Sequence, residues 1–253
     1  MLVVVASFAA TVPLAGDASG AVDDDSLAVT DDPVRPGGTI TVTGTADSTG
    51  DITFLVQDPE NDNAETVTKS INSTDFTTTI DLSELGINGA LNAGTATLMA
   101  DEGPTFTSAD DTTTFIIDSQ KPTVDIDSPT EGANRTATPA ISGTAHDDYA
   151  LDRVELSIQN ESDGRYYDPD SDTWQESRAW VNASGTADWT YDTSGITGDG
   201  TYEVAARVFD DAGNNRSYLS GPQAATDDNT LHVTYTVDTT LPTVAAVDTT
   251  AQN

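Results

Sequence analysis

The chain of 253 residues contains no cysteine, two histidines and only nine lysine or arginine residues. The absence of cysteine excludes a disulfide framework, a cysteine-based zinc site and thiol catalysis. The shortage of basic residues leaves no patch that could meet phosphate groups, so we expect no nucleic-acid partner. Long apolar runs are also scarce, because the main one, residues 2–15, is short and contains Pro13. We therefore expect a chain that does not itself span a membrane.

Acidic residues, by contrast, are in large excess, and 43 Asp and Glu give a formal net charge of −34. In ordinary buffer such self-repulsion opposes compaction. In molar salt the Debye length falls to about 3 Å, so the repulsion is screened. The composition therefore indicates a protein adapted to high salt, typical of a halophilic archaeon. A disordered acidic linker is the alternative, and the regular apolar alternation described below argues against it.

Residues 1–21 are typical of a secretory leader. The apolar run is followed by small residues and then by three aspartates, 23–25, which places a cleavage site after Ala21. The basic start of a usual leader is missing, since no Lys or Arg precedes Arg35. A first β-strand is the alternative interpretation. We predict export, and hence an extracellular or cell-surface location.

Two similar segments divide the rest of the chain. Residues 118–124 (DSQKPTV) and 238–244 (DTTLPTV) each follow an alternating apolar run, and they lie 120 residues apart. That spacing is the size of one all-β domain and indicates a repeated module. We expect one module at 22–119 and a second at 120–238. Residues 239–253 are then a linker or the start of a further module in a longer array.

Both modules contain short segments in which every second residue is apolar. The run 39–43 alternates and ends at Gly44. Further runs of this kind lie at 52–56, 96–100, 154–158, 202–208 and 231–237. No segment has a convincing helical period. The predicted fold class is all-β, with tandem antiparallel β-sandwiches.

The motifs of the second module resemble the Ig-like domains of bacterial and archaeal cell-surface proteins, of a haloarchaeal type. The matching segments are 122–126, 141–145, 152–156, 189–191 and 199–204, followed by the Asp-x-Ala-Gly-Asn turn at 210–214. The first module resembles them more loosely, through residues 29–46, and lacks that turn. The resemblance covers residues 25–245. It implies extracellular Ig-like sandwiches used as spacer or adhesive modules, and it implies no particular ligand.

One acidic loop has a spacing that suits calcium. Asp168, Asp170 and Asp172 place carboxylates at alternate positions, as in loops that curl around a hard cation. The full EF-hand pattern fails, because Thr173 stands where that pattern has glycine and Ala179 where it has glutamate. A solvated acidic hairpin is the alternative interpretation.

A second acidic group lies in the turn at 210–214. Asp210, Asp211 and Asn214 crowd this turn, and a calcium ion bound there would join it to a neighbouring module. The acidic residues Asp118 and Asp238, at the ends of the modules, suggest the same role. Capping of local backbone N–H groups is the alternative.

Five Asn-x-Ser/Thr sequons make N-glycosylation of an exported chain a hypothesis. Their asparagines are Asn72, Asn134, Asn160, Asn182 and Asn215.

Four aromatic residues, Tyr166, Tyr167, Trp174 and Trp180, cluster in a long insertion of the second module. They would form an exposed platform for a cell-surface protein or a glycan. A hairpin that packs these rings against the sandwich is the alternative.

Catalysis is not indicated. Neither His146 nor His232 is accompanied by a Gly-x-Ser-x-Gly nucleophile motif. We predict a non-catalytic structural or adhesive module of a halophilic cell-surface glycoprotein. The alternatives are accessory domains of a larger secreted hydrolase and a surface protein of a halophilic virus.

Overall fold

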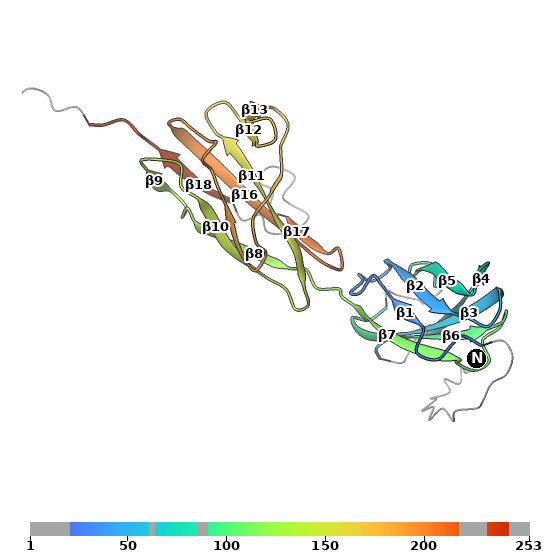
Figure 1. Cartoon of the computed structure of the whole chain (residues 1–253). Helices are drawn as coiled ribbons and strands as arrows, with labels where there is room; N and C mark the ends of the chain where they lie inside the picture. Colours follow the sequence, from blue (N-terminus) through green and yellow to red (C-terminus); the bar gives the residue numbers. More distant parts are fainter. Residues whose placement is uncertain (1–20, 61–63, 86–90, 218–231, 243–253) are drawn as a thin grey trace, which may run out of the picture. The chain divides into compact units, whose positions relative to one another are not determined.

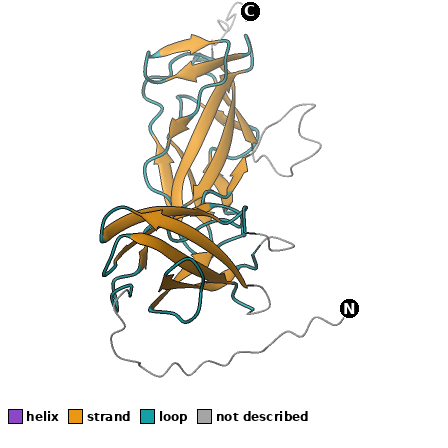
Figure 2. Ribbon diagram, turned by 90° about the vertical axis from the view of Figure 1, so that its right-hand side faces the viewer, coloured by secondary structure: helices purple, strands orange, loops and turns teal. Residues whose placement is uncertain are grey.

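The computed structural model describes residues 21–60, 64–85, 91–217 and 232–242. Within these residues every regular element is a β-strand (Figures 1 and 2), which confirms the predicted all-β fold class. No helix capable of crossing a bilayer is found in this part of the chain. Most of the predicted leader, residues 1–20, and most of the C-terminal stretch, residues 243–253, lie outside the described residues.

The chain folds as two compact units. Unit 1 comprises Met1–Asp31 and Gly37–Ile116, and unit 2 comprises Asp32–Pro36 and Ile117–Asn253. The short piece 32–36 belongs with unit 2 because Val34 forms a parallel bridge with Ile117. The carbonyl oxygen of Val34 also accepts the N–H of Asp118 at 2.9 Å.

Unit 1 contains two sheets. One has the strand order β1 (Ala28–Val29), β2 (Thr39–Thr45), β5 (Asp75–Asp81). The other has the order β4 (Ala64–Ile71), β3 (Gly50–Gln57), β6 (Gly94–Glu102), β7 (Asp111–Ile117). Alternate residues of β2 and β3 are fully buried, as period-2 patterning requires. The rings of Phe54 and Phe76, 6.2 Å apart between centroids, join the two sheets.

Unit 2 also contains two sheets (Figure 1). The smaller has the order β15 (Asp188–Tyr191), β10 (Ile141–His146), β8 (Thr123–Ser128). The larger has the order β13 (Thr173–Gln175), β12 (Arg165–Asp168), β11 (Leu151–Asn160), β16 (Gly200–Asp210), β18 (His232–Val237), β9 (Ala133–Arg135). Two further strands, β14 (Val181–Asn182) and β17 (Asn215–Ser217), pair with β11 and β16.

A single hydrophobic core lies between these two sheets of unit 2. The smaller sheet contributes Ile141 and Trp189, and the larger contributes Leu156, Tyr202 and Tyr235. The rings of Tyr202 and Tyr235 stack at 5.5 Å between centroids. Fully burying an apolar side chain of this size contributes roughly 1.5–3 kcal/mol. Because the chain has no cysteine, this core packing stabilises unit 2 without disulfides.

A glycine opposite an aromatic ring recurs in both units. Gly44 of β2 pairs with Phe76 of β5, and Gly143 of β10 pairs with Trp189 of β15. A Cβ atom on Gly44 would lie 2.6 Å from the Phe76 ring, and one on Gly143 would lie 2.3 Å from the Trp189 ring. Each glycine opens the Gly-Thr-Ala tripeptide that the two modules share. The missing side chain lets the partner ring lie across the strand.

Candidate metal centre

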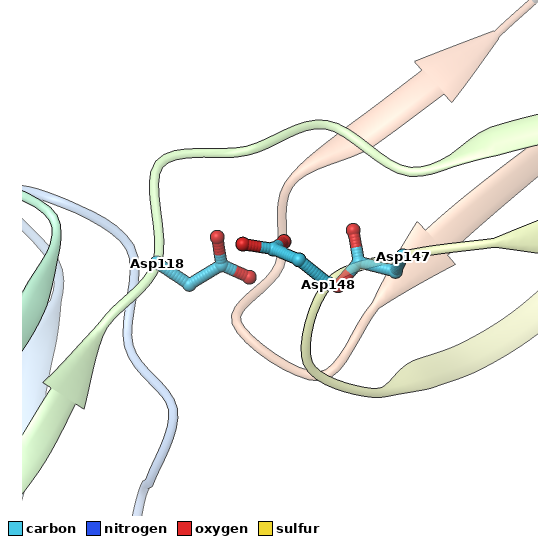
Figure 3. A group of neighbouring side chains, drawn as sticks. All are labelled: Asp118, Asp147 and Asp148. Carbon is cyan, nitrogen blue, oxygen red and sulfur yellow. The ribbon is translucent and has the colours of Figure 1, made fainter.

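Unit 2 brings three carboxylates together near its first residues. Asp118 lies between β7 and β8, whereas Asp147 and Asp148 follow β10 in the turn before β11. One oxygen from each carboxylate lies within 4.8 Å of the others. Figure 3 shows the side chains reaching toward one another from these two segments. We call these three residues the Asp118 cluster. In the part of the chain that the structure describes, no other three His, Cys, Asp or Glu residues converge in this way.

Local hydrogen bonds hold the ligand-bearing segments in place. Oδ1 of Asp118 accepts the N–H of Gln120 at 2.8 Å, which forms an Asx turn. Nδ2 of Asn214 donates to the carbonyl oxygen of Asp118 at 3.0 Å. Oδ2 of Asp147 accepts the N–H of Tyr149 at 3.0 Å. Each of these two carboxylates thus uses one oxygen for its own turn.

The other oxygens of these two carboxylates are buried and unpaired. Asp118 is 0% exposed. Among the described residues, neither Oδ2 of Asp118 nor Oδ1 of Asp147 has a hydrogen-bond partner. An unsatisfied buried polar group costs about 1–3 kcal/mol, and a charged group costs more. Since nearly all buried polar atoms in folded proteins are satisfied, such atoms call for a specific explanation.

Asp210 contributes a fourth buried carboxylate nearby. It is 2% exposed at the end of β16, and its Oδ1 accepts the N–H of Asn214 at 2.7 Å. Its Oδ2 is buried and has no hydrogen-bond partner in the described part of the chain. The negative charge of Asp210 acts on Asp118, and that of Asp147 acts on Asp210. The unit therefore concentrates negative charge in a poorly solvated place.

The pKa values reflect this concentration. Burial, together with the charges of the neighbouring carboxylates, raises the pKa of Asp118 to about 6, although the hydrogen bond from Gln120 acts in the opposite direction. Burial also raises the pKa of Asp210, against the hydrogen bonds from Asn214. These shifts show that the site disfavours its own ionised state. All the converging donors are carboxylate oxygens, which suit a hard cation.

The predicted calcium loop at 168–172 is arranged differently. Oδ1 of Asp168 accepts the N–H of Asp170 at 3.1 Å, and its Oδ2 accepts the hydroxyl of Ser171 at 2.9 Å. Oδ1 of Asp172 accepts the hydroxyl of Tyr167 at 2.8 Å. The three aspartates do not converge as the Asp118 cluster does. The Asp168 oxygens instead accept hydrogen bonds within the β12–β13 turn, and Asp172 accepts one from Tyr167 of β12.

The predicted turn at 210–214 is divided between two environments. Asp210 is buried, as described above, whereas Asp211 is exposed and its N–H donates to the carbonyl oxygen of Ala150 at 3.0 Å. The N–H of Asn214 donates to the Asp210 carboxylate, and the Asn214 side chain donates to the carbonyl oxygen of Asp118. The turn therefore supports the Asp118 cluster from β16.

The five sequon asparagines lie on both units. Asn72, Asn134, Asn182 and Asn215 are exposed, and Asn160 is half-buried. Oδ1 of Asn160 accepts the N–H of Ser162 at 2.9 Å.

The four predicted contact aromatics separate into two pairs. Tyr167 is buried, and the half-buried Trp174 packs between Tyr167 and Tyr202 at 5.5 and 5.9 Å between centroids. Tyr166 and Trp180 are also half-buried, and each carries an arginine over its ring. The first pair therefore extends the core, while the second remains partly accessible.

Asp147 and Asp148 are the members of the Asp118 cluster that sequence reasoning missed. The sequence does mark Asp118, because this residue recurs as Asp238 at the end of the next module. Asp147 and Asp148 directly follow the Gly-Thr-Ala strand. Their position in the turn between β10 and β11 was the available signal, but nothing in the sequence shows which acidic residues meet in space.

Comparison with protein families shows that residues 122–206 match the family described as a bacterial Ig domain. This match confirms the Ig-like resemblance for the second module. No match was found among curated proteins.

Comparison with solved structures finds similar chains at low identity. The fibronectin(III)-like modules of Clostridium thermocellum CbhA are 16% identical, with 87% of this chain and 99% of that chain covered and a TM-score of 0.37. A 1.5-MDa bacterial ice-binding adhesin is 18% identical, with 86% and 67% covered and a TM-score of 0.39. The chicken CNTN1 FN1-FN3 domains are 11% identical, with 85% and 68% covered and a TM-score of 0.37. Likeness at this level carries no function over to this chain.

Proposed function

We propose that this chain is a non-catalytic part of an exported surface protein of a salt-adapted organism, in which Ig-like modules act as spacers or contact domains. The observation that carries the proposal is the tandem construction. Unit 2 contains the segment that matches a bacterial Ig domain, and unit 1 repeats the two-sheet plan and the glycine–aromatic pair. Repetition of one module suits a protein whose role is reach and contact.

The arrangement of polar groups supports a structural role. His146 and His232 are both exposed. Two of the carboxylates that converge in unit 2, those of Asp118 and Asp147, are held by backbone N–H groups of their own turns. Such an arrangement fixes a loop and needs no substrate. The partner of the module would then be a cell-surface protein or a glycan, contacted through partly accessible rings such as Tyr166 and Trp180.

Stretching single molecules tests the spacer role. The full chain, held between its two ends, should unfold in two separate events, one for each unit. Each event should lengthen the chain by about 3.3–3.6 Å per residue released, less the folded length of the unit. Separate events are expected because each unit has its own core. A single event, or a gradual extension without force peaks, would contradict tandem modules.

Salt dependence tests the proposed habitat. The net charge of −34 should make the unfolding midpoint rise with KCl. Most of the rise should occur between 0.1 and 1 M, where the Debye length falls from about 10 to about 3 Å. A control variant with Asp23, Asp24 and Asp25 changed to Asn, all exposed, should show a weaker dependence. A midpoint that does not respond to salt would remove this explanation of the charge.

Labelling of intact cells tests export. An antibody raised against the full chain should bind cells of the source organism without permeabilisation, whereas an antibody against a cytoplasmic marker should not. Mass spectrometry of the chain from those cells should show whether the exposed sequons, such as Asn72 and Asn134, carry glycans. Binding only after permeabilisation would contradict the proposed location.

A further inference from the structure

We propose that the Asp118 cluster of unit 2 is a calcium-binding site. The proposal goes beyond the surface role proposed above and does not depend on it. It rests on two independent features: the convergence of carboxylates from separate segments, and the buried oxygens that the protein itself leaves unpaired.

The dimensions of the cluster fit calcium. Calcium binds oxygen ligands at about 2.3–2.6 Å, so ligands on opposite sides of one ion are roughly 4.6–5.2 Å apart. The three carboxylate oxygens, all within 4.8 Å of one another, therefore fit around one such ion. Magnesium requires about 2.0–2.1 Å and near-ideal octahedral geometry. The cluster contains neither His nor Cys, so the usual zinc ligands are missing from it.

The unpaired oxygens supply the second feature. Asp118 is fully buried, and its Oδ2 finds no hydrogen bond in the described residues. Oδ1 of Asp147 is also a buried atom without a hydrogen-bond partner in these residues, and so is Oδ2 of Asp210, which lies outside the converging group. A buried ionised oxygen without a partner is unfavourable, and a bound cation would satisfy several such oxygens at once. Asp148 is exposed and would complete the set from the solvent side.

The end of unit 2 offers an internal comparison. Asp238 repeats the local construction of Asp118: its Oδ1 accepts the N–H of Thr240 at 2.9 Å, and its own N–H donates to the carbonyl oxygen of Arg135 at 2.9 Å. Asp238, however, is exposed and belongs to no converging group among the described residues. The Asx turn alone therefore does not make a site. The carboxylates of the β10–β11 turn distinguish Asp118 from Asp238.

Calcium bound here would fix the segment through which the chain enters unit 2. The ion would connect Asp118, just after β7, to Asp147 and Asp148 after β10. Asn214 already holds the Asp118 carbonyl from the β16–β17 turn. The segment after β7, the β10–β11 turn and the β16–β17 turn would then be held together at one point. Local unfolding of residues 118–122 would therefore become rarer.

Calorimetric titration of the full chain with CaCl₂ in 1 M NaCl tests binding. The high salt screens diffuse attraction to the acidic surface. We expect one saturable site that survives this salt. Asp118→Asn and Asp148→Asn should each weaken calcium binding at least tenfold, whereas Asp238→Asn should leave the affinity unchanged. Because Asp148 is exposed, its variant retains the fold even if the Asp118 variant does not.

Hydrogen exchange provides a local readout. Calcium should slow exchange of the amides of Gln120 and Tyr149, which donate to Asp118 and Asp147. The amide of Thr240, which donates to Asp238, should not change. Magnesium at the same concentration should produce a much smaller effect.

Four outcomes would overturn the proposal. These are no saturable binding in 1 M NaCl, unchanged affinity in Asp148→Asn, equal weakening by Asp238→Asn, and equal effects of magnesium and calcium.

Discussion

Asp111 of unit 1 and Asp118 of unit 2 are both buried aspartates, but their oxygens meet different surroundings. Oδ2 of Asp111 accepts the N–H groups of Ser26 and Leu27 at 3.0 and 2.8 Å, and its Oδ1 accepts the N–H of Thr112 at 2.7 Å. Asp118 has a partner for Oδ1 only among the described residues. The Asp111 carboxylate therefore fixes backbone N–H groups in place. The Asp118 carboxylate retains a buried oxygen that has no hydrogen-bond partner in the described chain.

The difference shows why burial of an acid does not by itself identify a site. Asp101 of unit 1 is also buried, and its Oδ2 accepts hydrogen bonds from Thr107 and Ser108. Carboxylates satisfied in this way act as structural caps. Unsatisfied burial, together with convergence of several carboxylates, distinguishes the Asp118 cluster from them.

The largest loss of stability should come from replacing Gly143 or Gly44, the two glycines that lie opposite aromatic rings, with alanine. Gly143→Ala would place Cβ 1.9 Å from the carbonyl oxygen of Asp125, whereas Gly44→Ala would meet only the Phe76 ring, at 2.6 Å. A backbone carbonyl can shift less than a side-chain ring to relieve such a clash. Overpacking typically costs about 1–3 kcal/mol and occasionally more, so we expect unit 2 to lose about 3 kcal/mol or more and unit 1 about 1–2 kcal/mol. Calorimetry that resolves the two unfolding transitions checks this, and equal losses would contradict the comparison.

Removing the buried charge of Asp111 should produce the next largest effect. Asp111→Asn replaces one accepting oxygen with an amide group, which leaves either the N–H groups of Ser26 and Leu27 or the N–H of Thr112 without an acceptor. We expect unit 1 to lose about 2 kcal/mol. Denaturant unfolding of the variant measures it. A loss within experimental error would mean that Asp111 is not the cap that its hydrogen bonds indicate.

A smaller effect, with a defined pH dependence, should follow from Glu155→Gln in unit 2. Burial alone would raise the pKa of Glu155, but the hydrogen bonds from Arg153 and Arg207 outweigh it, and the pKa is lowered. A lowered pKa means that the carboxylate stabilises the fold above its ordinary pKa of about 4.3 and stops doing so as the pH falls through the lower folded value.

We therefore expect Glu155→Gln to cost about 1 kcal/mol at pH 7, a modest figure because Arg153 is partly exposed. The cost should vanish at a pH low enough to protonate Glu155 in the native protein. Urea unfolding of both proteins between pH 3 and 7 measures this. A cost that does not depend on pH would show that the charge of Glu155 is not responsible.

Strands with one buried face could be predicted from the sequence. Ile40 and Val42 of β2 and Val204 and Val208 of β16 are all fully buried, so the period of two is visible in the residues themselves. By contrast, β4 was not predicted, because this edge strand reads AETVTKSI and only Ile71 is buried. Polar residues on both faces hide the alternation.

The short strand β9 was missed for another reason. Its three residues, Ala-Asn-Arg, pair in parallel with β18, about 100 positions later in the chain. No local sequence pattern predicts pairing with a strand so distant in the chain.

The same limit applies to the proposed calcium site. The repeat drew attention to Asp118, but 43 acidic residues offer many possible neighbours. The pairing of β10 with β8, in which His146 lies opposite Thr123, brings the turn after β10 to the segment that contains Asp118.

Unfolding of unit 2 in Asp118→Asn and in the wild-type chain, each with EGTA and with saturating calcium, tests the central claim most directly. Without calcium the variant should be as stable as the wild type or more stable, because an unpaired buried charge has been removed and an amide donor now faces the neighbouring carboxylates. With calcium the order should reverse, because only the wild type gains stability from the bound ion. A variant that is less stable by the same amount in both conditions would contradict the claim, since Asp118 would then serve the fold and no cation.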